Sequence, residues 1–158
     1  EMKRWLMLAL VAFTCSAMFA QNNTDELISQ YSKDKHVQYL RVPQFLLKVA
    51  LTKLKSAGAI ELAQQVEGVR VLMLDNCGRH KRNSFRKDVN NLLTKGYQEF
   101  AKLKDADNDI LVLAKGDEKL ITEIGVLMTS EKGCKFAQIT GEMNPKDISA
   151  MVETVIDM

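Results

Sequence analysis

The chain has 158 residues, of which 46% are hydrophobic and 27% charged, and its 22 basic and 20 acidic residues give a net charge of +2. This length fits one domain with a single hydrophobic core. A charge so close to zero excludes the strong basic excess typical of nucleic-acid-binding domains, so we expect no nucleic-acid partner.

Residues 1–20 have the pattern of a secretory signal peptide. Lys3 and Arg4 precede the apolar run WLMLALVAF, and small residues follow it. The run to Ala20 falls short of the roughly 20 apolar residues that a membrane-spanning helix needs, and no later segment is longer. We therefore expect export, no transmembrane span, and a single domain over residues 21–158.

The cleavage position has two candidates, after Ala20 or after Ala17. Cys15 also leaves open a third outcome, a lipid-anchored protein, although the residues before it match a lipoprotein motif poorly. Removal of residues 1–20 would take away two basic residues and one acidic residue, which leaves a net charge of +1.

Hydrophobic periodicity predicts alternating helices and strands in the first half of the chain. Thr24 can cap a first helix, and Pro43 suits the first position of a second. A strand that is apolar on both faces ends near Asp75. The expected helix, strand, helix, short helical turn and strand cover residues 24–33, 36–42, 43–58, 59–68 and 69–75.

The second half begins with a helix capped by Asn83 or Ser84 and ended by Gly96. An antiparallel meander follows, with strands over residues 97–105, 110–116, 121–130 and 134–141. Asn144 and Pro145 then start a last helix. These elements predict the α+β class: one domain with a mostly antiparallel sheet of about five to six strands and helices packed on it.

Asp75, Cys77 and His80 follow the buried strand within six positions, which raises the possibility of a thiol nucleophile. In an exported protein, however, Cys77 and Cys134 would be the only remaining cysteines and could form a disulfide. Closing a loop of that length stabilises a fold by roughly 4 kcal/mol in the chain-entropy model. We favour the disulfide, or two half-buried thiols, over a catalytic cysteine.

A basic cluster surrounds the start of the helix that Asn83 or Ser84 is expected to cap. Several positive charges there oppose the helix dipole unless an anion compensates for them, which motivates an anion-binding site. The alternative is a solvated face screened by salt. The candidate anion-binding residues are Arg79, His80, Lys81, Arg82, Arg86 and Lys87.

Two patterns approach a metal site without completing one. Cys77, His80 and His36 offer half of a zinc site, but a structural zinc site needs a fourth ligand from a second closely spaced pair. Residues 105–116 start with the alternating aspartates of a calcium loop but have Ile110 and Gly116 where glycine and glutamate are required. We expect neither a metal nor a cofactor.

The stretches ELISQYSKDKHVQYLRVPQFLLKVA, VRVLMLDNC with a helix near SFRKDV, and LVLAKGDEKLITEIGVLMTS leading to FAQITGEMNPKDISAMV resemble the exported bacterial family catalogued as domain of unknown function 4252. The resemblance covers roughly residues 25–156. It implies a small α+β domain in the periplasm or associated with the outer membrane, and it implies no catalytic residues. A regulatory or binding role is a weaker implication.

The sequence therefore predicts an exported envelope protein that is not an enzyme and that binds a partner, either another envelope protein or an anionic ligand. Two alternatives remain: a small periplasmic enzyme that uses Cys77, and a lipid-anchored regulator.

Overall fold

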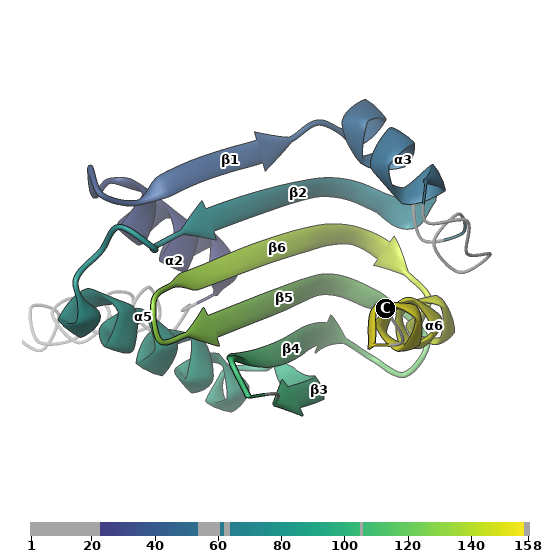
Figure 1. Ribbon diagram of the computed structural model, residues 1–158. Coiled ribbons are helices and arrows are strands. Elements are labelled where there is room, and N and C mark those ends of the chain that lie inside the picture. Colours follow the sequence, from purple (N-terminus) through teal and green to yellow (C-terminus); the bar gives the residue numbers. More distant parts are fainter. Residues whose placement is uncertain (1–22, 54–60, 62–63, 105, 157–158) are drawn as a thin grey trace, which may run out of the picture.

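Segments with alternating or continuous apolar residues pair into one antiparallel six-stranded sheet (Figure 1). The computed structural model describes residues 23–53, 61, 64–104 and 106–156. The strand order is β1-β2-β6-β5-β4-β3. The strands are β1 (Gln38–Val42), β2 (Val66–Met73), β3 (Gln98–Lys104), β4 (Asn108–Gly116), β5 (Ile121–Ser130) and β6 (Cys134–Met143).

Helices cover both faces of this sheet, so the predicted α+β class is confirmed. The helices are α2 (Thr24–Ser32), α3 (Gln44–Thr52), α5 (Arg79–Asn91) with a 3-10 turn at Leu92–Thr94, and α6 (Pro145–Ile156). Figure 1 shows α2 and α5 behind the sheet, at the end that carries the β5–β6 turn, and α3 and α6 at the other end of the strands.

The main core lies between the sheet and the pair α2 and α5. Phe85 of α5 is fully buried, and its ring meets the edge of Phe136 in β6 at a centroid distance of 5.7 Å. The ring of Tyr31 in α2 contacts the Phe85 ring, with the two ring centroids 4.8 Å apart. This aromatic row fixes α5 across the strands, which matters because α5 carries the basic cluster.

The other face of the sheet is apolar and only partly covered. Ile148 of α6 and Leu47 of α3 pack against its far end, next to Val66 and Met143. Toward the β5–β6 turn the same face stays open, and Leu40 and Met128 are 51% and 39% exposed.

Most element boundaries differ from the expectation by one or two residues, and three differences affect the fold or the candidate site. Strand β2 begins at Val66, within residues 59–68 that were expected to be a helical turn, although residues 64 and 65 are helical. Strand β4 already includes Asn108 and Asp109, which were expected in a turn. The third difference, the start of α5, alters the environment of the candidate anion site.

Helix α5 starts at Arg79 and not after Asn83 or Ser84. Gly78 is the N-cap residue in extended conformation, and its carbonyl accepts a hydrogen bond from Arg82 N–H at 3.1 Å. The basic residues thus belong to the first turns of the helix, and helical spacing decides which of them share a face.

The expected signal peptide and Cys15 lie outside the described residues. Within the described part of the chain, none of the helices combines the length and the apolar character that crossing a membrane requires.

Candidate functional site

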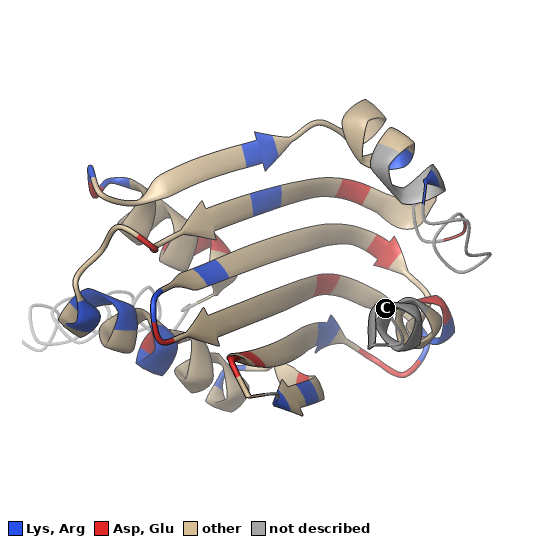
Figure 2. Ribbon diagram, in the orientation of Figure 1, with Lys and Arg blue, Asp and Glu red and all other residues tan. Residues whose placement is uncertain are grey.

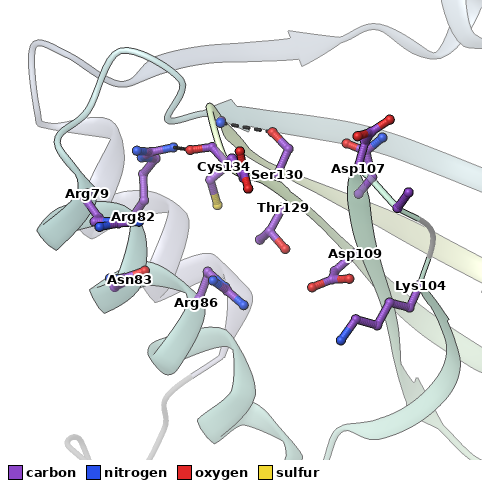
Figure 3. A pocket seen from close by; sticks show the side chains of 14 residues that line it. Arg79, Arg82, Asn83, Arg86, Lys104, Asp107, Asp109, Thr129, Ser130 and Cys134 are labelled. Carbon is purple, nitrogen blue, oxygen red and sulfur yellow. Dashed lines mark hydrogen bonds between the residues drawn. The ribbon is translucent and has the colours of Figure 1, made fainter.

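A cavity of ≈ 520 Å³ lies between α5 and the end of the sheet that carries the β3–β4 and β5–β6 turns (Figure 3). A volume of this size is typical of small-molecule sites, which range over about 300–1,000 Å³. The cavity is lined by Arg79, Arg82, Asn83, Arg86, Lys104, Ala106, Asp107, Asn108, Asp109, Thr129, Ser130, Glu131, Gly133 and Cys134.

Three arginines of α5 form one wall of the cavity. Arg79, Arg82 and Arg86 are spaced by three and four residues, so they lie along one face of the helix. Figure 3 shows them on the helix side, facing the sheet. Arg82 Nη1 donates to the Glu131 carbonyl oxygen at 3.1 Å, which holds this side chain across one end of the cavity.

Arg82 Nε is buried and has no hydrogen-bond partner. Within the described residues, no other buried side-chain nitrogen or oxygen lacks one. Buried polar groups are almost always paired, so an unpaired guanidinium nitrogen needs an explanation. Arg79 and Arg86 are exposed and make no side-chain hydrogen bond or ion pair within the described residues. The wall therefore carries positive charge that is largely uncompensated.

The sheet supplies the floor as a row of cross-strand neighbours. Cys134 of β6 pairs with Thr129 of β5, Thr129 pairs with Asp109 of β4, and Asp109 pairs with Lys104 of β3. Directly opposed residues of paired strands point to the same face. The row therefore presents a thiol, a hydroxyl, a carboxylate and an ammonium group in sequence beneath α5.

The structure brings together three of the six candidate anion-binding residues. Lys81 points elsewhere: it forms an ion pair with Asp34, and its Nζ lies 5.9 Å from the centre of the Tyr31 ring. His80 and Lys87 are exposed and do not line the cavity. Sequence reasoning missed Lys104, whose position depends on the pairing of β3 with β4.

Both candidate disulfide cysteines are free and buried, and the expected bridge is not formed in the structure. Burial raises the pKa of the Cys77 thiol, and it raises the pKa of Cys134 to about 11 although Arg86 and Arg82 act in the opposite direction. A thiol must ionise to act as a nucleophile. Both thiols are therefore neutral near pH 7, and only Cys134 lines the cavity.

Asp75 and His80 do not complete a nucleophile with Cys77. Asp75 Oδ1 accepts a hydrogen bond from the Cys134 backbone N–H at 3.0 Å, and its other oxygen lies 3.6 Å from Lys135 Nζ. His80 is exposed, and no hydrogen bond within the described residues joins it to the thiol or to the carboxylate. Asp75 thus anchors the start of β6.

A second polar cluster is internal and closed. The Glu123 carboxylate is 7% exposed and accepts hydrogen bonds from the hydroxyls of Thr24 and Tyr97 and from Gln138 Nε2. Arg70 Nε in turn donates to Gln138 Oε1 at 2.7 Å. Every acceptor in this cluster is occupied by the protein itself, so the cluster fastens α2 to the sheet.

Metal-binding chemistry is not gathered at either place. The described ranges contain no group of three or more His, Cys, Asp or Glu side chains arranged to hold a metal ion. The alternating aspartates near the β3–β4 turn include Asp109, which points into the cavity floor next to Lys104.

A family model described as "Domain of unknown function (DUF4252)" matches residues 31–151. This range includes α5, β3 to β6 and every residue that lines the cavity. No curated protein and no solved structure shows significant similarity to the chain. Because the match covers well over half of the sequence, the chain belongs to the family of domain of unknown function 4252.

Proposed function

We propose that this protein is a non-enzymatic binding module that holds a phosphate-type anion in the cavity beside α5. Three arginines along one face of α5 carry the proposal, because they line the cavity and form no ion pair of 4 Å or less within the described residues. An anion bound between them would supply the counter-charge through charge-assisted hydrogen bonds.

Arginine suits a phosphate better than a carboxylate at this wall. A planar guanidinium donates in a fixed fork that matches two oxygens of one phosphate group. Arg79, Arg82 and Arg86 offer three such forks along one helix face, which exceeds what a single carboxylate can accept. The first turns of α5 add the partial positive charge of a helix N-terminus.

The neutral thiols support a binding role over a covalent one. Cys77 is outside the cavity lining and Cys134 has a pKa raised to about 11 by burial. The alternative of a thiol-dependent enzyme would need one of them as a thiolate near neutral pH. The expected export would place the module in the periplasm or at the outer membrane, and a lipid anchor at Cys15 would make it membrane-attached.

The test compares two adjacent charges on the same helix. Arg86 lines the cavity, whereas Lys87 is exposed and does not. A ligand at ten times its dissociation constant stabilises a fold by about 1.4 kcal/mol, which raises the melting temperature of a domain of this size by about 3–5 °C. We expect inorganic phosphate to do this for the wild type and for Lys87→Ala, relative to chloride at equal ionic strength.

The Arg86→Ala variant should lose most of that increase. Equal responses of the two variants would point to non-specific screening and would refute the cavity as the anion site. Absence of any phosphate effect on the wild type at tens of millimolar would refute the proposed function.

A further inference from the structure

Two carboxylates, Asp107 and Asp109, line the cavity opposite its arginine wall, and Lys104 lies beside Asp109 on the neighbouring strand. With Glu131 in the turn that Arg82 contacts, four basic and three acidic residues line the cavity, so their charges sum to +1. Figure 3 shows Asp107 and Asp109 across the cavity from Arg82 and Arg86, with Thr129 and Ser130 between them. Figure 2 shows several basic residues along the start of α5, and both acidic and basic residues at the nearby turns and on β3.

The strand register gives the distance between the two charged sides. Arg82 Nη1 donates to the Glu131 carbonyl oxygen at 3.1 Å, in the turn that leads into β6, so the positive side lies next to β6. Asp109 lies two strands away, through Thr129. Two strand spacings of about 4.7–4.9 Å place the negative side on the order of 10 Å from the positive one.

Asp109 is not neutralised by a direct ion pair. Within the described residues, no ion pair of 4 Å or less joins Asp109 to an arginine of α5 or to its cross-strand neighbour Lys104. The side chain of Asp109 makes no hydrogen bond among these residues either. In a space large enough for a small molecule, the separated charges are compensated best by a ligand with its own charges in the reverse order.

We propose that the ligand is an organic phosphate that also carries an ammonium group, with polar atoms between them, as in an amino-sugar phosphate. The phosphate lies against the arginines and the ammonium group lies against Asp109. Ligand hydroxyls between the two face Thr129 and Ser130, which Figure 3 shows between the charged sides. This inference rests on the proposed anion site and adds the chemistry of the ligand's other end.

The test uses two sugars that differ in one group. Glucosamine 6-phosphate carries an ammonium group where glucose 6-phosphate carries a hydroxyl. A hydrogen bond to a charged group corresponds to at least about tenfold in affinity when it is fully formed. We expect calorimetry on the wild type to show glucosamine 6-phosphate binding at least about fivefold more tightly at neutral pH.

The isosteric variant Asp109→Asn should remove that preference without weakening glucose 6-phosphate. Glu142→Gln is the matched control because Glu142 is exposed on β6 and does not line the cavity. This control should keep the wild-type ratio. Circular dichroism of both variants checks that the fold is retained.

The two proposals fail in distinguishable ways. Equal affinities for the two sugars, unchanged in Asp109→Asn, would overturn the ammonium site while leaving the anion site intact. Absence of binding to either sugar and to inorganic phosphate would overturn both.

Discussion

Replacing Tyr97 by phenylalanine tests how α2 is held on the sheet. The Tyr97 hydroxyl donates to Glu123 Oε2 and accepts the backbone N–H of Thr24 at 3.3 Å. Thr24 is the first residue of α2 and is fully buried, so water cannot take the place of the lost hydroxyl. Phenylalanine keeps the buried ring and removes only this bridge.

The expected cost follows from the groups left behind. One is a buried carboxylate oxygen that loses a donor, and the other is a buried backbone N–H at a helix N-terminus. Each unpaired group costs about 1–3 kcal/mol, and the remaining donors to Glu123 limit the first of them. We therefore expect Tyr97→Phe to lower the free energy of unfolding by about 2–4 kcal/mol.

Urea denaturation followed by circular dichroism measures this change. Tyr39→Phe is the matched control, because the Tyr39 side chain is 44% exposed and makes no hydrogen bond within the described residues. Its cost should stay within about 0.5 kcal/mol, as for most surface substitutions. If both variants lose the same stability, the Tyr97 bridge does not fasten α2 and the reasoning fails.

Three further outcomes follow from burial and backbone geometry. Burial raises the pKa of Tyr97 from 10.0 to about 12. As the pH rises, the unfolded chain therefore loses the Tyr97 proton before the folded protein does, and the free energy of unfolding should fall between pH 10 and pH 12. Urea titrations measure this fall, which should be less steep in Tyr97→Phe. Cys77 and Cys134 should resist a water-soluble alkylating reagent at pH 7.5 until urea unfolds the protein, and mass spectrometry that finds rapid labelling would contradict their burial. Gly116→Ala should lower the free energy of unfolding by about 2 kcal/mol or more in the same denaturation assay, because the φ of Gly116 is 142° and a Cβ would lie 2.3 Å from the Leu120 backbone oxygen. Gly68→Ala is the control and should cost under about 1 kcal/mol, because a Cβ there would lie 3.7 Å from its nearest neighbour.

Local patterns in the sequence were enough to predict the class of the fold. Apolar alternation marked the strands of the second half, and Asn144 with Pro145 marked the start of α6. The strand order could not be predicted in this way. The pairing of β2 with β6 joins residues 66–73 to residues 135–141, and alternation identifies the faces of a strand but not its neighbours.

The candidate site was predicted in part. The misplaced start of α5 prevented the prediction of which basic residues share one helix face. Asn83 and Ser84 are stronger N-cap residues than Gly78, so cap preference placed the helix start within the basic cluster, after Arg82. With the start at Arg79, the spacing of Arg79, Arg82 and Arg86 defines one face. Lys104 and Asp109 had no comparable signal, because only the long-range register of β3, β4 and β5 brings them under α5.

The cysteines show a similar limit of sequence reasoning. An even number in an exported chain predicts a disulfide, but a bridge also requires Cβ atoms about 3.5–4.5 Å apart and correctly directed. Cys77 lies in the turn before α5 and Cys134 is the first residue of β6, and both remain thiols in the structure. Such geometry depends on how α5 packs and is not encoded in cysteine spacing.

Asp75 connects the anchored turn to the arginine wall. Its carboxylate fixes the Cys134 N–H at the start of β6, and a side chain at Gly133 would collide with it at 2.2 Å. The β5–β6 turn is therefore held in place, and its Glu131 carbonyl can in turn hold Arg82 across the cavity. The residue that first suggested acid-base chemistry thus acts on the site by positioning a turn. Its effect on the proposed anion site would be indirect, through the orientation of Arg82.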